Sequence, residues 1–158
     1  MIRLRAAVEA DLHSLFDLDQ ICVADGIAYS LSEFYSLLRS KGTIGVVAEE
    51  DDVLAGFAMA QFGRLRRTYG GHVITIDVAP EFRRRGVGRR LMEHLEGQVR
   101  DAGASWLRLE VAVNNSAALS FYVGLGFEAI GQIRGYYHRS LDAIVMEKVL
   151  ATDGELIR

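Results

Sequence analysis

The sequence contains only one cysteine, one proline and four histidines in 158 residues. A single cysteine, Cys22, excludes an internal disulfide and any cysteine-rich metal site, and we expect it to be a small core residue. The histidines are scattered without the spacing of metal ligands, so we expect no metal. The fold must therefore be held together by a hydrophobic core.

No apolar run approaches the length needed to cross a membrane, and no signal peptide is recognisable. We therefore expect no membrane partner and a cytoplasmic location. The formal net charge of −3 argues against a general nucleic-acid binder. Arginines instead cluster at residues 64–67 and 83–90, which favours a local site for an anionic ligand.

The remaining composition is that of an ordinary globular protein, half hydrophobic and one quarter charged. A chain of this length can form one domain with a sizeable core. We expect that domain to span residues 1–150, followed by a tail at 151–158 that has no recognisable pattern.

The central stretch of the chain is a predicted strand, turn and helix. The apolar run 73–78 predicts a buried strand that stops before Pro80. Apolar residues at four-residue spacing, from Val87 to Val99, predict the helix. Backbone N–H groups at a helix start have no intrahelical partner and favour an anion, and Gly86 and Gly88 would let a phosphate approach the backbone.

Other interpretations of this turn remain open. Glycines often serve strand-to-helix turns for structural reasons, and a run of arginines is usually a solvated face. The motif is not a dinucleotide fingerprint, because its third glycine would fall at Leu91. It is not a Walker loop either, because no Gly-Lys-Ser/Thr follows.

The order of predicted elements is strand, two helices, three strands, helix, strand, helix and two strands. Ser30 with Glu33 has the spacing of a capping box and predicts the start of the second helix, and Asp25-Gly26 predicts the break before it. We expect a basic connection at 63–71 and a loop at 134–141. The order predicts an α/β fold, a mixed sheet of about seven strands with four helices.

Two motifs carry a resemblance to a known family. Arg83-Arg84-Arg85-Gly86-Val87-Gly88 resembles the acetyl-CoA signature of the GNAT acetyltransferase superfamily. Asn115-x-x-Ala118-x-x-Phe121-Tyr122, followed by Gly126-Phe127, resembles its second conserved segment. Leu109-Glu110-Val111 and Gly135-Tyr136-Tyr137 narrow the resemblance to the ribosomal-protein alanine N-terminal acetyltransferases and to the wider protein N-terminal acetyltransferases of archaea and eukaryotes.

The resemblance implies that acetyl-CoA is the co-substrate. The pyrophosphate would bind backbone N–H groups at the start of the helix, and the pantetheine arm would pair with the strand at Ile76 to Val78. A backbone N–H near Val78 would hold the acetyl oxygen. Asn115 would bind the cofactor through its amide, or would be a turn or helix cap. The implied cofactor-binding residues are Ile76, Val78, Arg83, Arg84, Arg85, Gly86, Val87, Gly88, Arg89 and Asn115.

Two side chains are the implied catalytic residues. Glu110 would accept a proton from the α-amine through a water, since that amine has a pKa of about 7.7–8.0 and is partly protonated near neutral pH. Tyr122 would protonate the leaving thiolate, because a phenol keeps its proton at neutral pH. Considered alone, Glu110 could be an exposed strand glutamate, and Tyr122 a core aromatic beside Phe121.

The resemblance also implies an acceptor. Tyr136 and Tyr137 would close over a peptide N-terminus, and Tyr29 would form the opposite wall. The expected partner is a protein or peptide N-terminus, with a ribosomal protein as one candidate. His72 and His138 lie in no motif, and we expect them to be solvated.

Other functions remain open. The acceptor could be a lysine side chain or a small amine, although a lysine amine, with a pKa near 10.4, needs stronger deprotonation. The chain could also be a CoA-binding module without turnover. Neither the acceptor identity nor the oligomeric state follows from the sequence.

Overall fold

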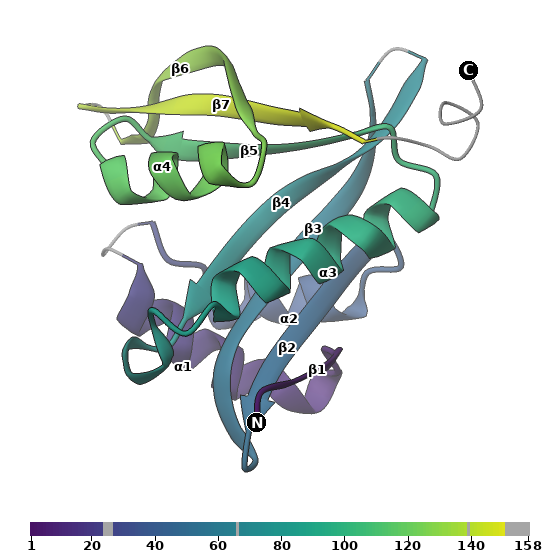
Figure 1. The fold of residues 1–158 in the computed structure, drawn as a ribbon, viewed down its shortest axis with the longest axis vertical. Helices are drawn as coiled ribbons and strands as arrows, with labels where there is room; N and C mark the ends of the chain where they lie inside the picture. The colour runs from purple at the N-terminus through teal and green to yellow at the C-terminus, as the bar shows by residue number, and fades with distance from the viewer. Residues whose placement is uncertain (24–26, 66, 139, 151–158) are drawn as a thin grey trace.

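The computed structural model describes residues 1–23, 27–65, 67–138 and 140–150. The predicted helix break at Asp25-Gly26 and the tail 151–158 lie outside the described residues. Within the described residues, seven strands form one sheet and four α-helices pack around it, which confirms the predicted fold class (Figure 1). The elements are β1 (Arg3–Ala6), α1 (Leu12–Cys22), α2 (Leu31–Arg39), β2 (Thr43–Glu50), β3 (Val53–Leu65), β4 (Thr68–Val78), α3 (Val87–Asp101), β5 (Trp106–Ala112), α4 (Ser116–Gly124), β6 (Glu128–His138) and β7 (Leu141–Val149), with single 3-10 turns η1 (Glu9–Asp11) and η2 (Pro80–Phe82).

The sheet has the order β1-β2-β3-β4-β5-β7-β6. All neighbouring strands are antiparallel except β4 and β5, which are parallel. These two strands pair only where Gly70–His72 meets Trp106–Arg108 and then diverge, as Figure 1 shows. The sheet is therefore divided into two parts that meet at one end.

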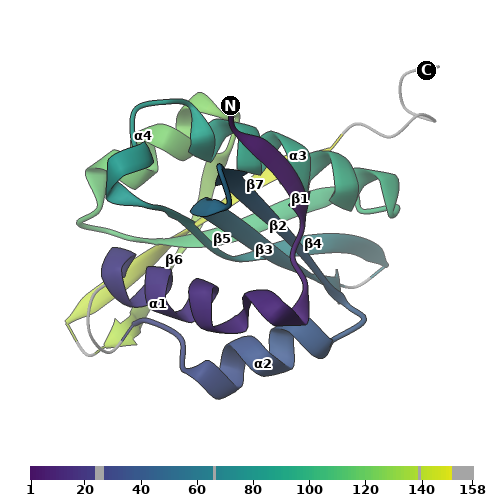
Figure 2. The same cartoon turned by 90° about the horizontal axis from the view of Figure 1, so that it is seen from below.

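The helices cover both faces of the sheet. Helices α1 and α2 lie on one face and α3 on the other, while α4 packs beside β5, β6 and β7 (Figure 2). The predicted stripe of α3 is buried, with Leu91 and Leu95 fully excluded from solvent. On α1 the buried positions are Leu15, Leu18 and Asp19. The described part of the chain has no helix both long and apolar enough to cross a membrane.

The predicted capping box at the start of α2 is present. The Ser30 hydroxyl accepts a hydrogen bond from the Glu33 N–H at 3.1 Å, and the Glu33 carboxylate accepts one from the Ser30 N–H at 3.2 Å. Each side chain thus satisfies a backbone donor that the helix leaves free. This cap fixes where the segment before α2 ends.

Two predicted loops are wrong. Residues 63–71 belong mostly to β3 and β4, which form a long hairpin stabilised by stacking of Phe62 on Tyr69 at 5.3 Å. Residues 134–141 belong mostly to β6 and β7, so Tyr136 and Tyr137 lie on a strand. The glycines and arginines that suggested loops are accommodated because cross-strand contacts outweigh weak local preferences.

Candidate active site

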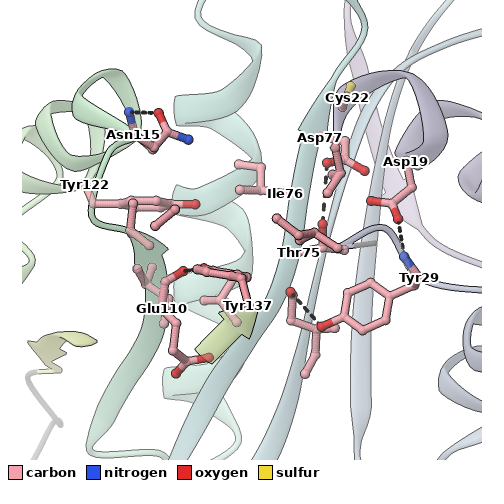
Figure 3. A pocket seen from close by; sticks show the side chains of 18 of the residues that line it. Asp19, Cys22, Tyr29, Thr75, Ile76, Asp77, Glu110, Asn115, Tyr122 and Tyr137 are labelled. Atoms are coloured by element: carbon pink, nitrogen blue, oxygen red, sulfur yellow. Dashed lines mark hydrogen bonds between the residues drawn. The ribbon is translucent and has the colours of Figure 1, made fainter. Parts of the chain in front are cut away.

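A cleft opens where β4 and β5 diverge, and its volume is about 880 Å³ (Figure 3). It is lined by residues from α1, the segment before α2, β4, β5, α4 and β6. The structure brings together nine of the predicted site residues here: Tyr29, Ile76, Val78, Arg83, Glu110, Asn115, Tyr122, Tyr136 and Tyr137. The rest of the arginine-glycine motif lies outside the lining of the cleft.

The cleft exposes an unpaired strand edge. Residues 73–78 of β4 pair with β3 on one side but have no β5 partner on the other. The Ala79 N–H donates to Ala55 O on the β3 side at 2.8 Å, so alternation along the strand directs the Val78 N–H toward the cleft. An extended ligand can therefore pair with this edge as an added strand.

The turn that follows β4 ends in a free helix N-terminus. Gly86 is the N-cap of α3 with φ of 75°, and Arg84 before it has φ of 64°. No described side chain caps the helix, and its first intrahelical bond runs from the Arg90 N–H to Gly86 O. The N–H groups of Val87, Gly88 and Arg89 precede that bond, so they are available to an anion.

Several arginines of the motif are held by protein groups. Arg85 donates two hydrogen bonds to Glu50, at 2.9 and 3.2 Å, and its guanidinium lies over the Phe82 ring. Arg83 donates from Nε to Val78 O at 3.1 Å, and Arg89 lies 3.4 Å from its helix neighbour Glu93. These contacts shape the turn, while the arginine charges remain close to the helix N-terminus.

Asn115 caps α4. Its side-chain oxygen accepts a hydrogen bond from the Ala118 N–H at 3.1 Å, and Figure 3 shows the amide nitrogen directed away from that bond. The cap uses the acceptor of the amide and leaves its donors free. The two interpretations that the sequence left open are therefore compatible.

Glu110 is the centre of a hydrogen-bonded group on the face of the sheet that α1 and α2 cover. Its Oε1 lies 2.6 Å from His72 Nε2 and accepts a bond from the Tyr136 hydroxyl at 2.8 Å. Burial raises the pKa of Glu110, but the hydrogen bond and charge of His72 and the Tyr136 hydroxyl outweigh it, so the pKa lies below its ordinary value. Glu110 is therefore a carboxylate at neutral pH.

Tyr122 lies on the same side of the cleft as Glu110, opposite Thr75 and Asp77 of β4, as Figure 3 shows. Its ring is buried and makes edge contacts with Phe121 and Phe127. Burial raises its pKa first, and the neighbouring Tyr137 and Asp77 raise it further. The hydroxyl consequently keeps its proton and can donate a hydrogen bond to a group that develops negative charge.

The tyrosines predicted as peptide walls surround the open end of the cleft. Tyr137 donates to Glu110 O at 3.1 Å, and its ring meets that of Tyr136 edge to face. Tyr29, from the segment before α2, donates to Ile74 O on β4 at 3.4 Å. Tyr136 is 44% exposed, so it is accessible to a macromolecular acceptor.

Sequence reasoning missed three residues and misplaced one. His72 was expected to be solvated, but the parallel register places it beside Arg108, two residues before Glu110. Asp19 and Asp77 are buried beside the cleft. For Asp77, the sequence signal was a single carboxylate within the apolar run 73–78.

Cys22 is a half-buried residue of the cleft wall and not of the core, and its thiol lies 3.4 Å from Val78 O. The described residues contain no group of three or more potential metal ligands.

Residues 11–127 match the model of the acetyltransferase (GNAT) family. The chain therefore belongs to this family and is an acetyltransferase, which confirms the resemblance inferred from the motifs. Enzymes of this family use acetyl-CoA as the acetyl donor.

Individual proteins similar to this chain indicate which kind of acetyltransferase it resembles. The chain is 31% identical over 132 residues to the N-terminal acetyltransferase B complex catalytic subunit naa20 of Schizosaccharomyces pombe, covering 79% of this chain and 73% of that protein. It is 39% identical over 99 residues to the [ribosomal protein bS18]-alanine N-acetyltransferase of Salmonella typhimurium, covering 61% and 64%. The crystal structure of the ribosomal-protein-S18-alanine N-acetyltransferase from Escherichia coli superposes with a TM-score of 0.86 at 28% identity, covering 98% of this chain and 97% of that one. The similarity thus extends to enzymes that acetylate protein N-termini.

Proposed function

We propose that this enzyme transfers an acetyl group from acetyl-CoA to the N-terminal α-amine of a protein or peptide. The observation that carries the proposal is the group formed by Glu110, His72 and Tyr136 at the peptide side of the cleft. The similarity of this chain to relatives that acetylate protein N-termini supports the same acceptor class. A ribosomal protein is one candidate acceptor, because that is the named substrate of the Salmonella relative.

The residues fit acetyl-CoA. The free N–H groups at the start of α3 suit the pyrophosphate, and the unpaired β4 edge at Ile76 and Val78 suits the amide groups of the pantetheine arm. The side-chain amide of Asn115 keeps donors for the same ligand. A Cβ at Gly86 would meet nothing within 4 Å, so the backbone there is open to a phosphate. The co-substrate supplies the thioester, and the protein orients it.

Glu110 removes the proton from the α-amine, through a water where the distance requires one. Its pKa is low, so it is a weak base, but the α-amine needs little help because its own pKa is about 7.7–8.0. His72, hydrogen-bonded to the same oxygen, holds the carboxylate in place. The Val78 N–H stabilises charge as it develops on the acetyl oxygen.

Tyr122 acts on the leaving group. A thiol has an ordinary pKa of about 8.5, well below that of this phenol, so complete proton transfer from Tyr122 to the sulfur is uphill. Tyr122 therefore contributes mainly a hydrogen bond to the sulfur as the bond to carbon breaks. The proton released by the attacking amine balances the thiol that is formed.

The acidic, aromatic acceptor end favours an α-amine over a lysine amine. Tyr29 and Tyr136 both line the cleft, where they can pack against the first residues of a chain. A lysine amine, with an ordinary pKa near 10.4, would need a far stronger base than a carboxylate whose pKa is lowered. The tyrosines that line the cleft and the low pKa of Glu110 therefore both favour an N-terminal α-amine over a lysine side chain as the acceptor.

The test measures CoA release with peptides whose N-termini are free or blocked. We expect turnover only with free N-termini, a loss of about 100-fold in kcat for Glu110→Gln, and a similar loss for Tyr122→Phe. Glu128→Gln and Tyr35→Phe, exposed positions outside the cleft, are the matched controls and should retain wild-type rates. Turnover that survives blocking would reassign the acceptor to lysine. Tight binding of acetyl-CoA without turnover on any amine would indicate that the protein is a CoA-binding module without catalytic activity.

A further inference from the structure

Two carboxyl groups outside the proposed chemistry are buried together beside the cleft. Asp19 on α1 is 0% exposed, and Asp77 on β4 is 3% exposed. Figure 3 shows the two side chains adjacent, between the cleft and the segment that carries Tyr29. Burying two acidic groups side by side is costly unless their oxygens find donors.

The donors account for only half of the four oxygens. Asp19 Oδ2 accepts the Tyr29 backbone N–H at 2.8 Å, and Asp77 Oδ1 accepts the Thr75 hydroxyl at 3.4 Å. The other two, Asp19 Oδ1 and Asp77 Oδ2, have no partner among the described residues. One proton between these two oxygens would satisfy both of them at once.

The environment indicates which residue holds that proton. Asp19 already accepts the Tyr29 backbone N–H through Oδ2, and its Oδ1 is free to accept from Asp77. Burial raises the pKa of Asp77 most, and the hydrogen bond and negative charge of Asp19 raise it further, against smaller opposing effects of Thr75 and Arg83.

We propose that Asp77 is a protonated acid that donates a hydrogen bond to Asp19, and that this pair positions Tyr29 as a wall of the acceptor site. The second part rests on the proposed function, through the role of Tyr29. The connection is direct: Asp77 immediately precedes Val78, Asp19 holds the Tyr29 N–H, and Gln20 Nε2 donates to Tyr29 O at 3.2 Å. The Tyr29 hydroxyl bonds back to Ile74 of the same strand. Asp19 and Asp77 are positioning residues, since neither contacts the reacting atoms.

Other titratable groups face the pair from each element around it. Cys22 lies on α1, Tyr29 before α2, Arg83 after β4 and Tyr122 on α4. The Arg83 guanidinium bonds Val78 O and lies 3.6 Å from the Cys22 sulfur. The Arg83 guanidinium therefore makes its hydrogen bonds to other groups beside the pair. The Asp77 oxygen is left available for a hydrogen bond with Asp19.

The first experiment needs no activity. Infrared or ¹³C NMR spectra of aspartate-labelled protein should contain one carboxyl that stays protonated at neutral pH, and Asp77→Asn should remove it. Asp17→Asn, at an exposed position of the same helix, should leave the signal unchanged. A wild-type spectrum with only ionised aspartates at neutral pH would overturn the proposal. This result is independent of which amine the enzyme acetylates.

The second experiment tests the positioning role. Asp77→Asn retains an N–H donor toward Asp19, so hydrogen exchange of the Tyr29 amide should stay slow and the peptide KM should remain within about twofold. Asp77→Ala removes the donor, so exchange should become fast and the peptide KM should rise about tenfold, with the acetyl-CoA KM unchanged. Slow exchange in Asp77→Ala would overturn the role of the pair. If no peptide is a substrate, the proposed function fails, while the exchange data still decide whether the pair positions Tyr29.

Discussion

Glu110 has two hydrogen-bonding neighbours that stabilise its charge, and neither is adjacent to it in sequence. His72 reaches it from β4 and Tyr136 from β6. The carboxylate is thus held by groups from two other strands. In the proposed mechanism, Glu110 receives the amine proton and a different residue, Tyr122, stabilises the sulfur.

The contact between His72 and Glu110 predicts a change in the pH profile. Glu110 must be ionised to act as a base, so activity falls as pH drops through its pKa, which His72 lowers. We expect His72→Ala to move the acid limb of kcat/KM to higher pH. His138→Ala, an exposed position on β6, should leave the limb in place. An unchanged acid limb in His72→Ala would contradict the claim that His72 lowers the pKa of the catalytic base.

Asp77 predicts a pH dependence of stability. Its pKa is raised above its value in the unfolded chain, so the folded protein retains a proton that the unfolded chain releases. The free energy of unfolding should therefore decrease with rising pH, from about pH 4 up to the raised pKa, by about 1.4 kcal/mol per pH unit. Urea denaturation of wild type and Asp77→Asn at several pH values isolates this slope, and parallel curves would contradict it.

At the scale of elements, the start of α3 depends on backbone conformation more than on side chains. Gly86 has φ of 75°, in the left-handed region, and its position lets the chain enter the helix with its N–H groups exposed. The glycine-arginine motif therefore specifies the backbone conformation of this turn. Arg83 stabilises the turn by a hydrogen bond to Val78 O, and Arg85 does so by hydrogen bonds to Glu50.

Gly86→Ala should distort the proposed pyrophosphate site at the start of α3. A left-handed conformation costs a non-glycine residue about 1–2 kcal/mol, so the turn should relax and raise the KM for acetyl-CoA about tenfold, with a smaller effect on the peptide KM. Gly97→Ala is the matched control, because Gly97 is inside α3 and its Cβ would approach nothing closer than Arg100 at 3.9 Å. That variant should keep its KM and gain up to about 1 kcal/mol in stability. Equal KM values for acetyl-CoA in both variants would contradict the assignment.

The elements differ in how well the sequence predicts them. The stripe of α3 and the capping box of α2 are local patterns, and both are present. The length of the β3–β4 hairpin was not predictable, because it depends on cross-strand contacts such as Phe62 with Tyr69. The roles of His72 and Asp77 depend on strand register and helix packing, which single-residue patterns do not contain.

At the scale of the molecule, the divergence of β4 and β5 creates the cleft. The two strands meet where the Trp106 ring covers Gly70, with no room for a Cβ, which would lie 2.0 Å from the ring. The Trp106 indole N–H donates to Thr68 at 3.0 Å, and Arg108 lies over the same ring. This contact is the joint between the two parts of the sheet.

Gly70→Ala should therefore weaken the whole fold. Overpacking of a close contact costs about 1–3 kcal/mol, which urea denaturation would detect as a lower free energy of unfolding. Gly63→Ala, on the same hairpin but with nothing within 4 Å of its Cβ, is the control and should change stability little. Equal stability of the two variants would mean that the joint is not tightly packed.

The proposed acceptor is an N-terminal α-amine. The most direct measurement uses one peptide that carries both a free N-terminus and internal lysines, incubated with acetyl-CoA near neutral pH and sequenced by tandem mass spectrometry. The acetyl group should be found on the α-nitrogen, and Glu110→Gln should reduce its amount. Acetylation of lysine with a free, unmodified N-terminus would contradict the account.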